Sequence, residues 1–276
     1  MDDADPVATA LAHLGRRARG MPMARDLRVT LNFHPDVIVR GDILLTVLAR
    51  ERIYRSQFET GSSNGSLTAF PGGDRHRWES ELFGGAYDDG PVSARPKYGA
   101  LNHRRSAVGG APRFGSAHLR LRPHVLERAT FCYPDSHLDP AAFGLADRME
   151  LIALVEADTP SIDPLDAYVE AQVHGPVRIE EDVEAVVLDP SHRGTAVEEA
   201  SRHLPCAVEW HDGFRMGEDR IADCALYRSE EAAQLAHSLI ADGVLVPRDL
   251  GRARHTGQVN PQTLKHAWHC LARFGR

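Results

Sequence analysis

Residues 168–177 read Tyr-Val-Glu-Ala-Gln-Val-His-Gly-Pro-Val. Polar and apolar residues alternate, so in an extended strand Glu170, Gln172 and His174 share one face and the neighbouring valines and alanine share the other. A carboxylate, an amide and an imidazole on one face belong either at an exposed sheet edge or in the wall of a polar cleft. The alternation alone favours the exposed edge.

On both sides of this strand, hydrophobic periodicity predicts a mixture of helices and strands. Apolar residues at helical spacing and two Asp-Pro caps, at Asp5-Pro6 and Asp139-Pro140, predict helices, whereas strict alternation predicts strands. The predicted helices cover 6–20, 42–53, 139–157, a segment from Thr195, 229–241 and 261–273; the predicted strands cover 27–34, 66–70, 98–102, 116–121, 167–174, 183–189 and 207–210. This mixture indicates an α+β protein.

Composition narrows the class of protein. The chain has 276 residues and a formal net charge of −7, which argues against a nucleic-acid partner. No apolar run is long enough to span a bilayer, and the acidic start Met1-Asp2-Asp3 is unlike a signal peptide, so we expect no membrane association and a cytoplasmic protein, or one exported without a cleavable signal. The four cysteines form no close pair, so neither structural zinc nor a disulfide framework is expected.

The tripeptide His34-Pro35-Asp36 ends the predicted strand 27–34. A His-x-Asp pair at a strand end supplies two metal ligands in hydrolases that activate water on a divalent ion. The same pair is also consistent with a solvated strand end. A metal-dependent hydrolase built on His34 and Asp36 is therefore one alternative.

Residues 54–66 read Tyr-Arg-Ser-Gln-Phe-Glu-Thr-Gly-Ser-Ser-Asn-Gly-Ser and open a glycine-rich region that extends to residue 116. Residues 54–59 are expected to be extended. Such loops inside a compact domain are often functional, although Asn64-Gly65 also fits the turn of an exposed hairpin. The region has neither the P-loop pattern nor a Gly-x-Gly-x-x-Gly motif, so the two commonest nucleotide-binding folds are not supported.

Taken in chain order, these pieces resemble the catalytic domain of ADP-ribosyltransferases of the poly(ADP-ribose)-polymerase-like branch. Phe33-His34-Pro35-Asp36 corresponds to the His-Gly strand, 43–48 to the short helix after it, 60–70 to the nicotinamide hairpin, and Glu170 with 172–177 to the glutamate strand. The further segments 95–102 and 113–116 are similar to CteC-like bacterial effectors, which ADP-ribosylate ubiquitin on threonine. The resemblance covers about residues 27–190.

The resemblance implies an enzyme that uses NAD as a substrate, with Asp36 and Glu170 as catalytic residues. Glu170 would stabilise an oxocarbenium-like state, and Asp36 would either position a ribose hydroxyl or act as base for the acceptor. The implied NAD-binding residues are His34, Arg55, Thr60, Gly61, Ser62, Asn64 and Ser66. Two departures stand out: Pro35-Asp36 replaces the glycine after histidine, and Ser66 and Thr68 occupy the strand where the branch has tyrosine.

The implied fold is an ADP-ribosyltransferase-like split β-sandwich, with two short sheets around an NAD cleft and flanking helices. We expect an N-terminal helix in 1–26, a catalytic domain in 27–228 and a helical C-terminal extension in 229–276. The implied acceptor is a protein hydroxyl, with threonine of ubiquitin as the candidate. A module that binds NAD without turning it over is the second alternative.

Overall fold

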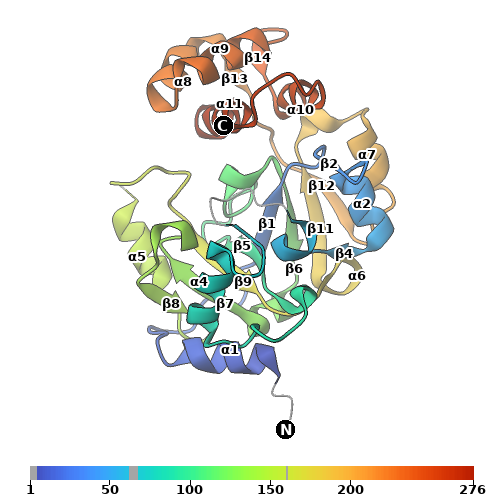
Figure 1. The fold of residues 1–276 in the computed structure, drawn as a ribbon. Coiled ribbons are helices and arrows are strands. Elements are labelled where there is room, and N and C mark those ends of the chain that lie inside the picture. The colour runs from blue at the N-terminus through green and yellow to red at the C-terminus, as the bar shows by residue number, and fades with distance from the viewer. Residues whose placement is uncertain (1–4, 62–67, 160) are drawn as a thin grey trace. The chain divides into compact units, whose positions relative to one another are not determined.

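The computed structural model describes residues 5–61, 68–159 and 161–276 and confirms the α+β class (Figure 1). Its largest sheet has eight strands in the order β12-β11-β6-β1-β5-β9-β7-β8, and three two-stranded sheets occur among the described residues. The chain divides into two units, Met1–Leu31, Ile53–Ala111 and Arg120–Glu184 in unit 1 and Asn32–Arg52, Pro112–Leu119 and Ala185–Arg276 in unit 2. The predicted split into two short sheets and the predicted division into three segments both stay predictions.

The helices and strands follow one another without a repeating pattern. The helices are α1 (Pro6–Gly15), α2 (Leu44–Glu51), α3 (Gln57–Thr60), α4 (Asp74–Phe83), α5 (Leu151–Asp158), α6 (Ile179–Asp182), α7 (Ala196–Ser201), α8 (Ile221–Tyr227), α9 (Glu230–Ser238), α10 (Pro247–His255) and α11 (Pro261–Phe274). The strands are β1 (Val29–Phe33), β2 (Ile38–Val39), β3 (Asp42–Ile43), β4 (Ile53–Tyr54), β5 (Lys97–Leu101), β6 (Ala117–Leu121), β7 (Ala129–Tyr133), β8 (Ala142–Gly144), β9 (Val169–Val173), β10 (Val177–Arg178), β11 (Val183–Leu188), β12 (Ala207–Trp210), β13 (Met216–Gly217) and β14 (Val244–Leu245).

In unit 1, β9 is an interior strand. It pairs antiparallel with β5 on one side, where Glu170 faces Ala100, and with β7 on the other, where Glu170 faces Cys132. All five residues of β9 are buried. The exposed-edge interpretation of this strand is therefore wrong, because both of its edges are paired.

Helices α1 and α4 complete the core of unit 1. Asp5 caps α1 by accepting from the Val7 N–H, as the Asp-Pro signature predicts. Apolar residues of both helices pack with side chains of β7, β8 and the segment after α4, in a cluster formed by Ala10, Leu14, Leu82, Phe83, Tyr87, Cys132 and Phe143. Phe83 and Tyr87 of this cluster contact the ring of His174, with ring centres 5.0 and 5.8 Å apart, so the core adjoins the polar face of the Glu170 strand.

Unit 2 combines the parallel pair β11–β12, of which β11 begins in unit 1, with the C-terminal helices. Asn260 caps α11 as predicted, accepting from the N–H groups of Gln262 and Thr263. Cys224 of α8 and Cys270 of α11 form a disulfide. The sequence, from which no disulfide framework was expected, did not indicate this bridge. Their separation of 46 residues hides the pair in the sequence.

Four local predictions differ from the structure. Residues 57–60 are helical rather than extended, because Ser56 and Glu59 form a capping box. No strand covers 68–70; the remainder of the predicted strand 66–70 lies outside the described residues. The predicted loop around 74–83 is helix α4, and the start of the predicted helix 139–157 is strand β8, followed by α5.

None of the helices that the structure describes is long and apolar enough to cross a membrane.

Candidate functional site

The carboxylate of Glu170, on the polar face of β9, accepts several hydrogen bonds. Its Oε2 accepts hydrogen bonds from the Ser136 amide at 3.2 Å and the Ser136 hydroxyl at 3.0 Å. Its Oε1 accepts from Gln172 Nε2 at 2.9 Å, and the Cys132 thiol donates to it at 3.7 Å. Only 6% of Glu170 is exposed, so these donors take the place of water.

Opposing influences act on the Glu170 charge. Burial raises the pKa of the Glu170 carboxyl above its ordinary value, and the nearby Asp135 carboxylate raises it further. The Arg75 guanidinium opposes this rise in pKa, as do the hydrogen bonds from Gln172 and Ser136. A carboxylate with a raised pKa and a cation beside it is a recognised mark of functional sites.

A chain of hydrogen bonds leads from Glu170 through the buried side chains of its own face. Gln172 Oε1 accepts from Thr130 Oγ1 at 2.9 Å, Thr130 Oγ1 lies 2.9 Å from His174 Nε2, and His174 Nδ1 lies 2.6 Å from the Tyr87 hydroxyl. Gln172 and His174 are fully buried. The three polar residues picked out by sequence alternation therefore belong to one internal network.

The carboxylate fixes the direction of every bond in this chain. Because ionised Glu170 only accepts, Gln172 turns its amide nitrogen to it and its oxygen to Thr130, whose single proton is then used. His174 must therefore carry its proton on Nε2 and accept from Tyr87 at Nδ1. Burial lowers the pKa of His174 to about 3, which keeps the ring neutral as this arrangement requires.

A second buried cluster comes from α4, which the sequence patterns missed. Glu79 accepts from the Tyr98 hydroxyl at 2.6 Å and from Arg95 NH1 at 2.7 Å, and burial raises the pKa of Glu79. Arg75, one turn earlier, donates to Ser136 Oγ at 2.9 Å and so joins this cluster to Glu170. The signal that was available is the spacing of Arg75, Glu79 and Leu82–Phe83 on one helical face.

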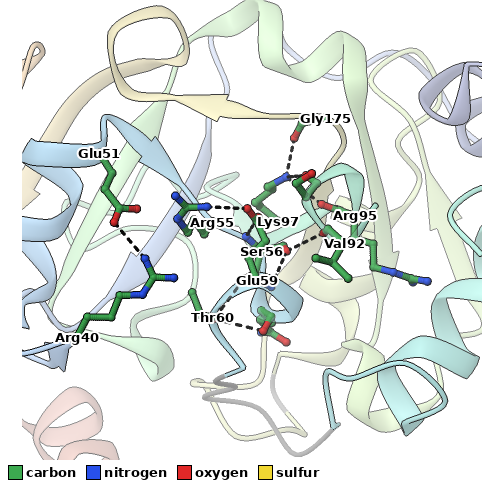
Figure 2. Close-up of polar contacts among 12 residues, drawn as sticks. Arg40, Glu51, Arg55, Ser56, Glu59, Thr60, Val92, Arg95, Lys97 and Gly175 are labelled. Carbon is green, nitrogen blue, oxygen red and sulfur yellow. Dashed lines mark hydrogen bonds and ion pairs between the residues drawn. The ribbon is translucent and has the colours of Figure 1, made fainter. Parts of the chain in front are cut away.

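Three of the implied NAD-binding residues, Arg55, Thr60 and Gly61, form hydrogen bonds or ion pairs within α3 and at its ends (Figure 2). Arg55 forms an ion pair with Glu59 at 3.1 Å, and Thr60 Oγ1 donates to the carbonyls of Ser56 and Gln57 at 3.2 and 3.3 Å. Gly61 ends the helix with a positive φ of 63°, and its amide donates to Gln57 O. Ser62, Asn64 and Ser66 lie outside the described residues.

Lys97 ties β5 to the turn after β9. Its ammonium donates to the carbonyls of Ser93, Arg95 and Gly175 at 2.8, 3.0 and 3.1 Å, and Figure 2 shows it reaching Gly175. Burial lowers the pKa of Lys97 to about 8. With all three protons directed at carbonyl oxygens, Lys97 holds the backbone at the end of the Glu170 strand.

His34 and Asp36 belong to unit 2. The His34 ring contacts Trp268 edge-on at 4.8 Å, and burial holds the pKa of His34 well below its ordinary value. Asp36 Oδ1 accepts from Arg254 at 3.3 Å, and its carbonyl accepts from His255 Nε2 at 2.6 Å. The partners of Asp36 come from α10, and His34 packs against Trp268 of α11, so the two residues are not the solvated strand end that one interpretation favoured.

Among the described residues, no group of three or more His, Cys, Asp or Glu side chains is arranged to hold a metal ion. The metal-hydrolase alternative thus has only His34 and Asp36 as starting ligands, and Asp36 is paired with Arg254.

Comparison with protein families assigns the chain to one of them. The model of the family described as Protein of unknown function (DUF3626) matches residues 28–159 and 152–274. The two matches together cover most of the chain, which therefore belongs to the DUF3626 family. No curated protein matches it.

Proposed function

We propose that this protein is a mono-ADP-ribosyltransferase that transfers ADP-ribose from NAD to a hydroxyl group of a protein. The observation that carries the proposal is the buried Glu170 carboxylate, held by Ser136 and Gln172 on an interior strand with Arg75 nearby. Fixed negative charge beside a cation-like transition state lowers its energy, and no reorganisation is needed when it is already in place.

The reaction replaces the carbon–nitrogen bond of the nicotinamide-bearing ribose carbon with a carbon–oxygen bond. The glycosidic carbon–nitrogen bond breaks with its electron pair leaving on nicotinamide, and the acceptor oxygen forms the new bond and gives up its proton. Glu170 would accept a hydrogen bond from the ribose 2′-hydroxyl while positive charge develops on the ring. Asp36 would either take the acceptor proton or position a ribose hydroxyl.

The remaining predictions from the resemblance belong to the same proposal. They are the split β-sandwich fold, NAD contacts by His34, Arg55, Thr60, Gly61, Ser62, Asn64 and Ser66, and threonine of ubiquitin as acceptor. The proposed setting is the cytoplasm of a producing bacterium or, after export without a cleavable signal, a host cell. Function does not follow from fold alone, so the acceptor needs its own test by intact-mass measurement of ubiquitin incubated with protein and NAD.

The first experiment compares nicotinamide release from NAD by the wild type, Glu170→Gln and Glu127→Gln. The first variant keeps the shape of the side chain and removes its charge; Glu127 is an exposed glutamate of the same unit and serves as the matched control. We expect release to fall by about 100-fold or more in Glu170→Gln, the size expected for loss of one transition-state contact. Release by Glu127→Gln should be unchanged. Equal release by all three proteins would refute the role of Glu170.

Two further measurements separate the alternatives. NAD binding by calorimetry without nicotinamide release supports the binding module. A hydrolytic activity that chelator abolishes and a divalent ion restores supports the metal-dependent hydrolase, and His34→Ala and Asp36→Ala would then both lose it.

A further inference from the structure

We infer that Arg75 is a positioning residue for Glu170, acting through the hydroxyl of Ser136. This inference rests on the proposed function, because it assigns Arg75 to the carboxylate that the proposed reaction uses. Arg75 comes from α4, a helix that contributes none of the residues implied by the resemblance.

The hydroxyl of Ser136 lies between Arg75 and Glu170 and can be hydrogen-bonded to them in only one direction. Arg75 NH1 lies 2.9 Å from Ser136 Oγ, and Ser136 Oγ lies 3.0 Å from Glu170 Oε2. A guanidinium has only donors, so the serine oxygen accepts from Arg75 and its one proton goes to Glu170. Arg75 thereby fixes the rotation of the hydroxyl, and the Ser136 amide adds a second bond to the same carboxylate oxygen.

Arg75 is itself held in place by aromatic rings. Its guanidinium carbon lies 4.2 Å from the centre of the Tyr98 ring and 5.5 Å from that of Trp78, and only 4% of the residue is exposed. Tyr98 is anchored in turn by its bond to Glu79. A planar cation stacked in this way loses little freedom when it donates, which suits a group that orients another.

The groups that face Glu170 come from several elements. Arg75 reaches it from α4, Cys132 from β7, Asp135 and Ser136 from the segment after β7, Tyr98 from β5, and Gln172 from β9 itself. Asp135 carries negative charge, and Cys132 and Tyr98 stay neutral because burial raises the pKa of each. Arg75 supplies positive charge, so its loss should raise the pKa of Glu170 further.

The test compares Arg75→Gln, Arg75→Lys and Ser136→Ala with the control Arg77→Gln. Arg77 lies on the same helix, pairs with Asp74 and is exposed. Nicotinamide release is measured across pH with kcat and KM separated, and the Glu170 carboxyl is titrated by carbon-13 NMR, with Glu170→Gln assigning its signal. The NMR readout needs no activity.

In Arg75→Gln we expect kcat to fall about ten-fold or more with KM nearly unchanged. The acid limb of the pH–rate profile, where activity falls as Glu170 is protonated, should move up by about one pH unit. Arg75→Lys should keep the acid limb near its wild-type position because it keeps the charge. Ser136→Ala should lower kcat with a smaller shift of the limb, and Arg77→Gln should match the wild type.

Two outcomes would overturn the inference. One is an Arg75→Gln variant that is folded and matches Arg77→Gln in rate and pH profile. The other is a Glu170 carboxyl titration that is the same in wild type and Arg75→Gln. If the wild type releases no nicotinamide, the proposed function is refuted, and the NMR titration of Glu170 still tests the inference about Arg75. If Arg75→Gln does not fold, Arg75→Lys and Ser136→Ala test the inference by the pH–rate profile and the NMR titration.

Discussion

Thr130 is fully buried, and its hydroxyl is shared between Gln172 and His174. Thr130→Val keeps the shape and leaves the Gln172 oxygen and the His174 Nε2 proton without partners. An unsatisfied buried polar group costs about 1–3 kcal/mol. We therefore expect the free energy of unfolding, measured by urea denaturation, to fall by about 3 kcal/mol.

Thr130→Ser is the matched control for this prediction. It keeps the hydroxyl and removes only a methyl group, so its cost should be about 1 kcal/mol. Equal losses for the serine and valine variants would mean that the Thr130 hydroxyl contributes nothing to stability.

At single residues, the sequence identifies what lies on a regular pattern. Glu170, Gln172 and His174 stand out because polar side chains interrupt an apolar strand. Arg75 and Glu79 do not, since a hydropathy pattern places charged residues on the outer face of a helix, whereas here both are buried. Their burial depends on Ser136, Arg95 and Tyr98, which lie outside α4 in the sequence.

Helix α10 packs against Asp36 at a glycine. A Cβ at Gly251 would overlap Asp36 Oδ2, so any other residue here would require the Asp36 carboxylate to move. Replacing glycine by alanine inside a helix normally stabilises it by about 1 kcal/mol. For Gly251→Ala we instead expect a net loss of about 1–3 kcal/mol, the usual cost of overpacking, in urea denaturation.

The Asp36→Ala background provides the control for Gly251→Ala. Without the carboxylate the new methyl group has room, so the same substitution should stabilise the protein by about 1 kcal/mol there. A destabilisation of equal size in both backgrounds would show that α10 is limited by something other than Asp36.

Elements were predicted well where the signal is local and poorly where a distant partner decides. The caps at Asp5 and Asn260 start α1 and α11 as expected. Asp139-Pro140 has a similar cap pattern, yet 142–144 pair with β7 as strand β8, because the sheet offers hydrogen-bond partners there. The order of strands, which places β9 inside the sheet, is likewise absent from any local pattern.

At the scale of the whole chain, each unit is assembled from separate segments. Residues 32–52 belong to the same unit as 185–276, although 132 residues separate the two segments in sequence. Linear changes in composition along the chain cannot indicate a unit that is assembled from separate segments. His34 and Asp36 consequently share a unit with α10 and α11, and Glu170 shares one with α4.

The two units differ in buried histidines, which predicts different responses to acid. Burial lowers the pKa of His34, His192 and His269 in unit 2, to about 2 for His269, and of His174 in unit 1. An unfolded histidine binds a proton below pH 6.5 while these folded ones do not, so the free energy of unfolding falls as the pH drops. Between pH 7 and pH 5 a histidine such as His269 or His174 costs about 2 kcal/mol.

Two buried carboxyl groups of unit 1 have the opposite effect on stability in acid. Burial raises the pKa of Glu79 and Glu170, so their folded forms bind protons more readily than the unfolded chain and resist acid. We therefore expect unit 2 to lose more stability than unit 1 between pH 7 and pH 5. Tryptophan fluorescence during urea denaturation measures the stability of each unit in two double variants. In Trp78→Phe/Trp210→Phe the remaining Trp268 reports on unit 2, and in Trp210→Phe/Trp268→Phe the remaining Trp78 reports on unit 1. The urea midpoint reported by Trp268 should fall further than that reported by Trp78, and equal shifts would contradict the histidine argument.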